Sequence, residues 1–152
     1  MQPNQFVTLF SDSFDTFKVF DNLSIDETTP TGAPKTAWQI LNHLIAWQQY
    51  QLEILNGSAS FEIDEQTTWI TEAYAATQEQ LNDSVLHFYG LIEEVKGQIA
   101  NFDIMDAAIG QKIKTVQDLA MHLSFHVGEM VLMRRMTGCY PMPHEMSTFL
   151  KQ

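Results

Sequence analysis

The chain has 152 residues, 45% of them hydrophobic, so it has the length of one ordinary domain (residues 1–152) and enough apolar side chains to bury a core. Its net charge of -11 repels phosphate backbones and anionic lipid surfaces, so we expect neither nucleic acid nor a membrane as a partner. Three features favour a cytoplasmic protein. The chain has a single cysteine, Cys139; it shows no secretory signal; and it has no run approaching the ~20 apolar residues of a membrane span.

The first predicted element is an amphipathic helix over residues 4–22. Apolar side chains recur there at helical spacing between polar residues. They are Phe6, Leu9, Phe10, Phe14, Phe17 and Phe20. A loop is predicted over residues 26–34, because Pro30 and Pro34 each disfavour helical backbone before them and Gly32 favours a turn.

A second helix is predicted to begin after Thr36, a suitable N-cap residue, and to end at the Asn-Gly-Ser sequence of residues 56–58. It carries apolar residues on more than one side, so it should pack against two neighbours. These residues include Ile40, Leu44, Trp47, Leu52 and Leu55. His43 lies within the same apolar envelope.

A polar linker over residues 57–66 precedes the third predicted helix. Apolar residues keep helical spacing from Trp69 to Ile99, for some thirty residues. Gly90 and Gly97 weaken this helix, so we expect a kink or a break in it.

The last helix is predicted to follow a connector over residues 101–114. Thr115 followed by Asp118 resembles an N-terminal cap, and Gly138 should end the helix. With four helical segments and no alternation typical of strands, the sequence predicts an all-α fold, a four-helix bundle.

Two histidines one turn apart stand in the last helix. At about 100° per residue, His122, His126 and Glu129 fall within roughly 60° of one another on its apolar side. Such a histidine pair can chelate a divalent ion, because imidazole nitrogen lies about 2.0–2.1 Å from zinc and neighbours at i, i+4 are close. A third ligand must come from another element, and His43 is the best candidate. His87 and His144 we assign to ordinary positions.

Structural interpretations of these residues stay open. A single histidine in an apolar stripe, such as His43, is more often a hydrogen-bonded core residue than a ligand. Glu129 alternatively pairs with Arg134 or Arg135 near the surface. Trp47, one turn beyond His43, is either core or the wall of a substrate pocket.

Three stretches together resemble one known family. They are Thr-Ala-Trp-Gln-Ile-Leu-Asn-His at residues 36–43, His-Leu-Ser-Phe-His-Val-Gly-Glu at 122–129, and Arg-Arg-Met-Thr-Gly at 134–138, followed by a tail with prolines. In this order they resemble the DinB/YfiT-like metal-dependent enzymes, four-helix bundles unrelated to the DNA polymerase that shares the first name. The resemblance covers nearly the whole chain.

The resemblance implies that His43, His122 and His126 are metal ligands, with zinc, nickel, iron or manganese as the ion and water completing its shell. It implies a small-molecule substrate and a homodimer. Family members include thiol S-transferases that use low-molecular-weight thiols, and others look like metal-dependent hydrolases. One departure is Glu129, where the family often has glutamine. This carboxylate could bind the ion, orient a ligand or act as a catalytic base.

Three neutral imidazoles would leave a divalent ion with its full charge and with open positions, which makes a Lewis acid able to activate water or a thiol. The sequence does not choose between hydrolysis and thiol transfer. An alternative from another class is a helical bundle without catalysis that binds a small molecule or a partner and uses its histidines structurally.

Overall fold

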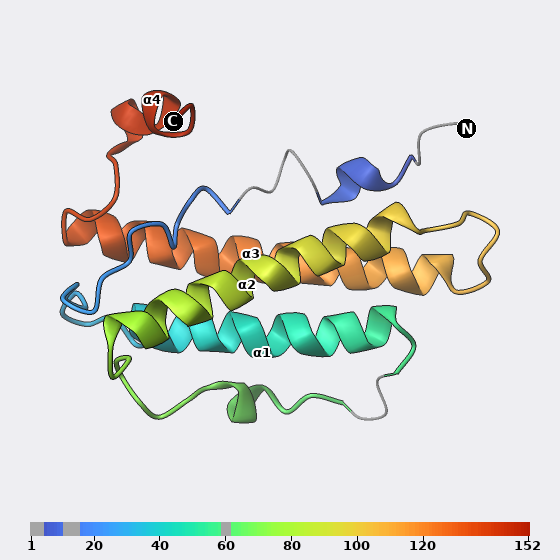
Figure 1. The fold of residues 1–152 in the computed structure, drawn as a ribbon, viewed down its shortest axis with the longest axis horizontal. Helices are drawn as coiled ribbons and strands as arrows, with labels where there is room; N and C mark the ends of the chain where they lie inside the picture. The colour runs from blue at the N-terminus through green and yellow to red at the C-terminus, as the bar shows by residue number, and fades with distance from the viewer. Residues whose placement is uncertain (1–4, 11–15, 59–61) are drawn as a thin grey trace.

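The computed structural model describes residues 5–10, 16–58 and 62–152, and within these ranges it contains helices and no strand. The prediction of an all-α fold is confirmed. Three long helices, α1 (Ala37–Leu55), α2 (Gln78–Ala100) and α3 (Ile109–Met136), form the body, and α1 packs against both others (Figure 1). Single turns complete the fold: η1 (Val7–Leu9), η2 (Glu65–Thr68), η3 (Pro143–Glu145) and α4 (Met146–Phe149).

The direction of the helices explains how the loops reach the core. As the colours of Figure 1 show, α1 and α2 run in the same direction and α3 runs in the opposite one. The chain between α1 and α2 must therefore return along the whole length of α1 before α2 begins. This return path carries η2 along α1, which it contacts.

The helix α1 has the boundaries that its sequence predicts. Thr36 Oγ1 accepts a hydrogen bond from the Gln39 amide at 3.2 Å, and Gln39 Oε1 accepts one from the Thr36 amide at 3.1 Å. This reciprocal pair satisfies two backbone N–H groups that the first turn leaves without helical partners. After Leu55 the chain leaves the helix, and Gly57 has a φ of 72°, a conformation that glycine adopts without strain.

The predicted helix over residues 4–22 is wrong for the residues that the structure describes. Residue 4 and residues 11–15 lie outside the described ranges, but Phe17, Lys18 and Asn22 have φ values of 48°, 53° and 55°, which no right-handed helix contains. The backbone carbonyl groups here accept hydrogen bonds from distant side chains, for example from Tyr140 to the Phe17 oxygen at 2.7 Å. Where the structure describes it, the segment predicted as the first long helix forms the single turn η1 and the turns of residues 17–22.

The third predicted helix begins later than its apolar spacing indicates, at Gln78 rather than near Trp69. Residues 69–77 are held as a loop because the N-cap residue of α1 and one side chain in its first turn bind their carbonyl groups. Thr36 Oγ1 donates to the Ala73 oxygen at 2.5 Å, and Gln39 Nε2 donates to the Ile70 oxygen at 3.3 Å. The helix α2 then runs without a break through both of its glycines.

The last helix begins earlier than predicted, at Ile109. Asp106 Oδ1 accepts a hydrogen bond from the Ala108 amide at 2.8 Å, which leads the chain into the helix. Thr115 is therefore an interior residue, and its Oγ1 donates to the Gln111 oxygen one turn earlier at 3.0 Å. The predicted end is confirmed, since α3 stops at Met136 and Gly138 has a φ of 75°.

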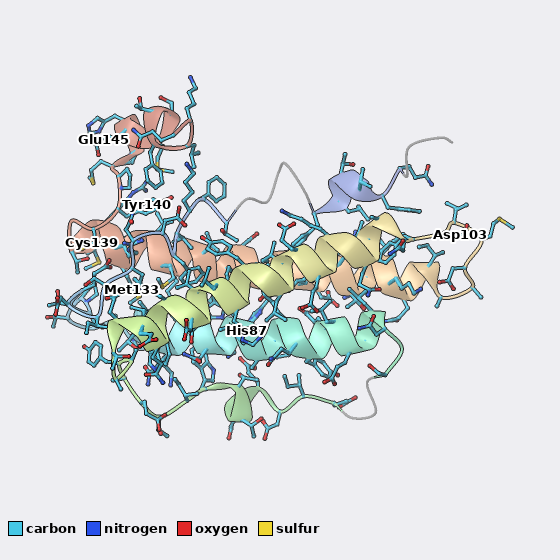
Figure 2. All side chains as sticks on the ribbon, in the orientation of Figure 1. His87, Asp103, Met133, Cys139, Tyr140 and Glu145 are labelled. Atoms are coloured by element: carbon cyan, nitrogen blue, oxygen red, sulfur yellow. The ribbon has the colours of Figure 1, made fainter. Side chains whose placement is uncertain are left out.

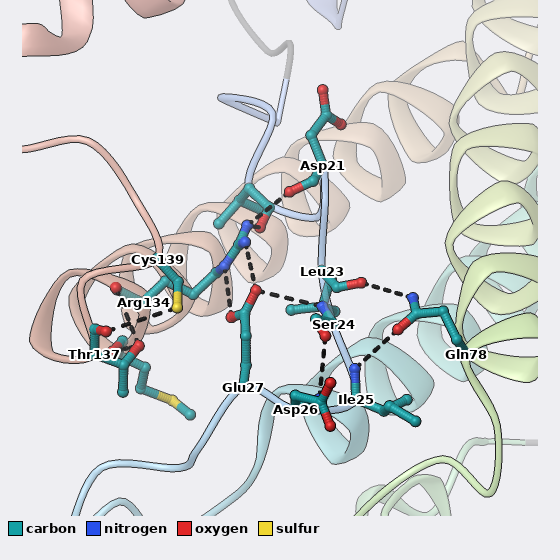
Figure 3. A network of polar contacts seen from close by, with 12 residues as sticks. Asp21, Leu23, Ser24, Ile25, Asp26, Glu27, Gln78, Arg134, Thr137 and Cys139 are labelled. Atoms are coloured by element: carbon teal, nitrogen blue, oxygen red, sulfur yellow. Dashed lines mark hydrogen bonds and ion pairs between the residues drawn. The ribbon is translucent and has the colours of Figure 1, made fainter.

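The helices enclose one apolar core. Polar contacts with side chains of α2 and α3 hold the segment before α1 against the helices (Figure 3). Phe20 packs edge to face on Phe88 of α2, with ring centroids 4.7 Å apart. Gln78 of α2 donates to the Leu23 oxygen at 2.9 Å, and its own oxygen accepts from the Ile25 amide at 3.0 Å. Hydrophobic burial and these hydrogen bonds together stabilise the non-helical conformation of this segment.

Candidate metal centre

The fold brings His43 of α1 together with His122 and His126 of α3. One ring nitrogen from each lies within 4.8 Å of the others, and the Nε2 atoms of His43 and His122 are 3.0 Å apart. His43 is fully buried and His126 is 6% exposed. The three histidines therefore lie close together and could bind a metal ion, after small rotations that bring each nitrogen to about 2.0–2.1 Å from it.

A hydrogen-bonded chain fixes the protonation of His43. Thr68 of η2 donates its hydroxyl hydrogen to the Glu65 oxygen at 2.5 Å, so its Oγ1 is free to accept from His43 Nδ1, which lies 2.6 Å away. The proton of the neutral ring must then be on Nδ1. Its Nε2 carries a lone pair and faces His122.

Glu129 is placed to orient the ring of His126. Its Oε2 lies 3.0 Å from Nδ1 of His126, the ring nitrogen that donates to a carboxylate when Nε2 is left for a metal. The expected surface pairing with an arginine is not what the structure shows, because Arg134 pairs with Glu27 and Arg135 donates to the Pro141 oxygen. The sequence left three roles open for Glu129, and the hydrogen bond to His126 supports the orienting role.

His122 differs from the other two. Its Nδ1 is buried, and none of the described residues provides a hydrogen-bond partner for it. Burial, with the nearby ring of His126, lowers the pKa of His122 to about 4. Burial and the neighbouring His122, His126 and Lys35 lower the pKa of His43 to about 3. Both rings are thus neutral at pH 7, the form in which imidazole binds metals.

Two tryptophans enclose the cluster. Trp69, which follows η2, stacks on His43 with ring centroids 3.7 Å apart and planes 6° apart, and Lys35 Nζ lies 4.9 Å from its centroid. Trp47 is one turn beyond His43 on α1, with its ring 5.2 Å from that of His122. Trp47 therefore lies beside the histidines as the sequence predicts, and its role as a pocket wall stays a prediction.

The sequence analysis missed Thr68 and Trp69. The apolar spacing predicts Trp69 at the start of a helix, and Thr68 falls between the predicted linker of residues 57–66 and that helix. No spacing rule would identify them, because they reach His43 only through the return path of the chain along α1. A weak signal was present in Asp64, whose Oδ1 accepts from the Gln66 amide at 3.0 Å and marks a turn before them.

The remaining candidate residues lie apart from the cluster. His87 on α2, His144 in η3 and Cys139 are all exposed. Figure 2 labels His87 on α2 and Cys139 after the end of α3. His87 makes one long contact, 3.5 Å from its Nε2 to Gln49 Nε2. The positions of His87 and His144 agree with the ordinary roles that the sequence assigns to them.

No model of a protein family matches the chain, and no curated protein or solved structure is significantly similar to it. The site must therefore be interpreted from its own geometry. Within the described ranges, none of the helices has the length and apolar character needed to cross a bilayer.

Proposed function

We propose that this protein is a metal-dependent enzyme of the DinB/YfiT-like kind, in which His43, His122 and His126 hold one divalent ion. Zinc, nickel, iron and manganese all accept imidazole ligands. Held by three neutral imidazoles, such an ion supplies a Lewis acid for hydrolysis or for the transfer of a low-molecular-weight thiol to a small substrate.

The observation that carries this proposal is the arrangement of the ring nitrogens. Hydrogen bonds of His43 to Thr68 and of His126 to Glu129 occupy the Nδ1 atoms and leave the Nε2 lone pairs for a ligand. Neighbours that fix the tautomer and ring orientation in this way are the usual companions of metal-binding histidines. A purely structural cluster would not require the protons to be on Nδ1 and the lone pairs on Nε2.

The chain's own residues have separate tasks in this proposal. Thr68 and Glu129 hold the protons of two ligands at Nδ1. Trp69 covers the flat face of His43 and excludes water from it. Trp47, whose Nε1 is buried without a hydrogen-bond partner among the described residues, can offer that N–H group to a polar atom of a substrate.

Metal analysis tests the proposal directly. Protein purified without an affinity tag or chelator should contain near-stoichiometric metal by elemental analysis. His122→Ala should lose the metal and keep its far-UV circular dichroism, while the matched control His87→Ala, at an exposed site, should keep both. Metal-free wild-type protein after purification and reconstitution would contradict the proposal.

A second assay separates the two chemistries. The metal-loaded protein is offered ester and amide substrates without a thiol, and model electrophiles with a panel of low-molecular-weight thiols. A hydrolase should turn over the first set, whereas a transferase should be inert until the correct thiol is present. In either case turnover should be absent in His122→Ala.

The alternative is a bundle without catalysis that binds a small molecule or a partner. The contact between His43 and His122 supports it, because two imidazoles 3.0 Å apart can hydrogen-bond each other. It predicts that removal of metal leaves binding unchanged and that no substrate is turned over. Unfolding on metal removal would instead indicate a structural ion.

A further inference from the structure

A pocket lies on the side of α3 that faces away from the histidine cluster. Its volume is about 300 Å³, at the small end of the pockets that bind small molecules. The α3 residues that line it lie, at about 100° per residue, within roughly 100° of one another and about 180° from the histidines. They are Ser124, Val127, Gly128, Val131 and Arg135. The pocket is therefore separate from the candidate metal centre.

The other walls of the pocket come from both ends of the chain. Phe17 lies before α1, and Tyr140 and Met146 belong to the segment after α3, whose helix α4 lies on the side of α3 away from α1 (Figure 1). Tyr140 is 5% exposed, and its hydroxyl group donates to the Phe17 oxygen at 2.7 Å. The ring of Phe149 packs edge to face on that of Tyr140, with centroids 5.5 Å apart. These contacts hold the walls together, so the pocket is formed before a ligand binds.

The lining of the pocket is mostly apolar, and among the described residues that line it only Arg135 is charged. Its Nε donates to the Pro141 oxygen at 2.8 Å, and its guanidinium carbon lies 5.6 Å from the centroid of the Tyr140 ring. Within the described ranges no carboxylate pairs with this guanidinium group. Its two terminal nitrogens can therefore donate to a ligand in the pocket.

Other cations of the protein are already paired with carboxylates. Arg134 donates to both carboxylate oxygens of Glu27. Lys112 lines a second hollow, of about 170 Å³ beside the end of α1, but its ammonium group pairs with Asp106 at 2.6 Å. In a chain with 19 acidic and 8 basic side chains, Arg135 thus keeps its charge available in apolar surroundings. Such surroundings strengthen the pairing of an arginine with an incoming anion.

We propose that this pocket binds a small carboxylic acid whose carboxylate pairs with Arg135 and whose apolar body, of the size of a medium-chain fatty acid, lies against Phe17, Val131 and Met146. The planar guanidinium group can donate two parallel hydrogen bonds to a carboxylate. One cation matches one negative charge, and the net charge of -11 disfavours more highly charged ligands such as phosphate esters. The proposal does not depend on the metal.

The first experiment tests the role of the charge, with octanoate as the probe in isothermal titration calorimetry. The wild-type chain should bind one octanoate saturably, and Arg135→Ala should weaken binding by about 10–100-fold, because hydrogen bonds to a charged group are lost. The matched control Lys96→Ala, which removes a positive charge from α2 outside the pocket, should bind as the wild type does. Octanol, which lacks the carboxylate, should bind at least ~10-fold more weakly than octanoate. Absence of saturable binding, or equal affinities of wild type and Arg135→Ala, would overturn the proposal.

The second experiment tests the apolar part and the location of the site. Affinity should fall roughly fourfold for each methylene removed, from octanoate to hexanoate to butanoate. Gly128→Leu should fill the pocket and weaken octanoate binding at least ~10-fold with unchanged far-UV circular dichroism, because a Cβ built on Gly128 meets nothing within 4 Å. The matched control Gly97→Leu, an equally open glycine on α2, should keep the affinity.

One further variant excludes the metal centre as the binding site. His122→Ala, which lacks a proposed metal ligand, should bind octanoate with the affinity of the wild type. Loss of binding in this variant would place the carboxylate on the metal ion and overturn the proposal, as would octanoate binding that Gly128→Leu leaves unchanged. Failure of the metal analysis, in contrast, leaves the octanoate result as it is.

Discussion

Two polar clusters are buried against α3, and they differ in how completely their hydrogen bonds are satisfied. The guanidinium group of Arg134 donates to both carboxylate oxygens of Glu27 at 3.0 and 2.7 Å and to the carbonyl oxygens of Val19 and Asp21 at 2.8 and 3.0 Å (Figure 3). In the histidine cluster, two turns earlier, Nδ1 of His122 has no partner among the described residues.

The degree to which the buried polar groups are hydrogen-bonded distinguishes a cluster that stabilises the fold from one that can bind a ligand. A buried cation that donates four hydrogen bonds to a carboxylate and two backbone carbonyl groups holds two segments together. Buried nitrogens that face one another with free lone pairs are costly for the fold, and they become favourable when a ligand or ion engages them. We therefore expect changes in the first cluster to affect stability, and changes in the second to affect binding.

The largest expected effect is that of Arg134→Ala on folding. Removing this cation leaves the carboxylate of Glu27 and two carbonyl groups without their donor, which should cost about 3–5 kcal/mol of unfolding free energy. Urea denaturation followed by circular dichroism measures it. The control Arg135→Ala should cost less than about 1 kcal/mol, because this side chain is only half-buried and its Nε donates to a single carbonyl group, that of Pro141. Equal losses in the two variants would contradict the comparison.

Thr68→Val should act on the other cluster, lowering metal affinity by about 10–100-fold with little change of the fold, because His43 loses the acceptor that keeps its proton on Nδ1. Competition with a chromophoric chelator gives the affinity. Thr68→Ser retains the hydroxyl group and should restore most of it. If valine and serine behave alike, the hydroxyl group does not position His43.

A smaller effect is expected at Glu129. Glu129→Ala should reduce metal affinity by about 10-fold, since His126 loses the carboxylate that accepts from its Nδ1. Glu129→Gln keeps a hydrogen-bond acceptor without the charge, so its loss should be smaller than that of alanine. If turnover but not affinity falls in the glutamine variant, the carboxylate acts as a base rather than as an orienting group.

The last prediction concerns the stability of the metal-free protein as pH falls. The pKa of His43 is lowered to about 3 and that of His122 to about 4 in the folded state. Between about pH 6.5 and pH 4 the unfolded chain therefore binds protons that the folded chain does not, so stability falls as pH falls, by at most about 1.4 kcal/mol per pH unit for each group. Urea midpoints at pH 7, 6 and 5 in the presence of chelator should show this slope. His43→Gln combined with His122→Gln should flatten it, whereas Arg134→Lys should not.

The parts of the fold that were predictable from the sequence are those governed by local interactions. The N-cap residue Thr36 and the helical period after it predicted the helix on which His43 lies, and the i, i+4 spacing placed His122 and His126 on one face. Their convergence needed one further assumption, that both helices turn their apolar sides inward. Each of these inferences depends on residues within a turn or two of each other.

The parts that failed depend on distant contacts. Tyr140 and Arg134 bind the carbonyl groups of the segment before α1, and α1 binds those of residues 69–77, so aromatic residues at helical spacing lie in loops instead. Such contacts bring together residues far apart along the chain and leave no periodic mark in it. For the same reason Thr68, the partner of His43, could not be identified from its own neighbourhood.

The parallel stacking of Trp69 on His43 gives the site an optical reporter of its own. An indole ring in face contact with an imidazole, 3.7 Å between centroids, is quenched differently when that imidazole gains a proton or an ion. With Trp38 and Trp47 replaced by phenylalanine, the fluorescence of the remaining tryptophan would follow events at a single side chain. Titrations at the centre can then be read in real time, without added dye.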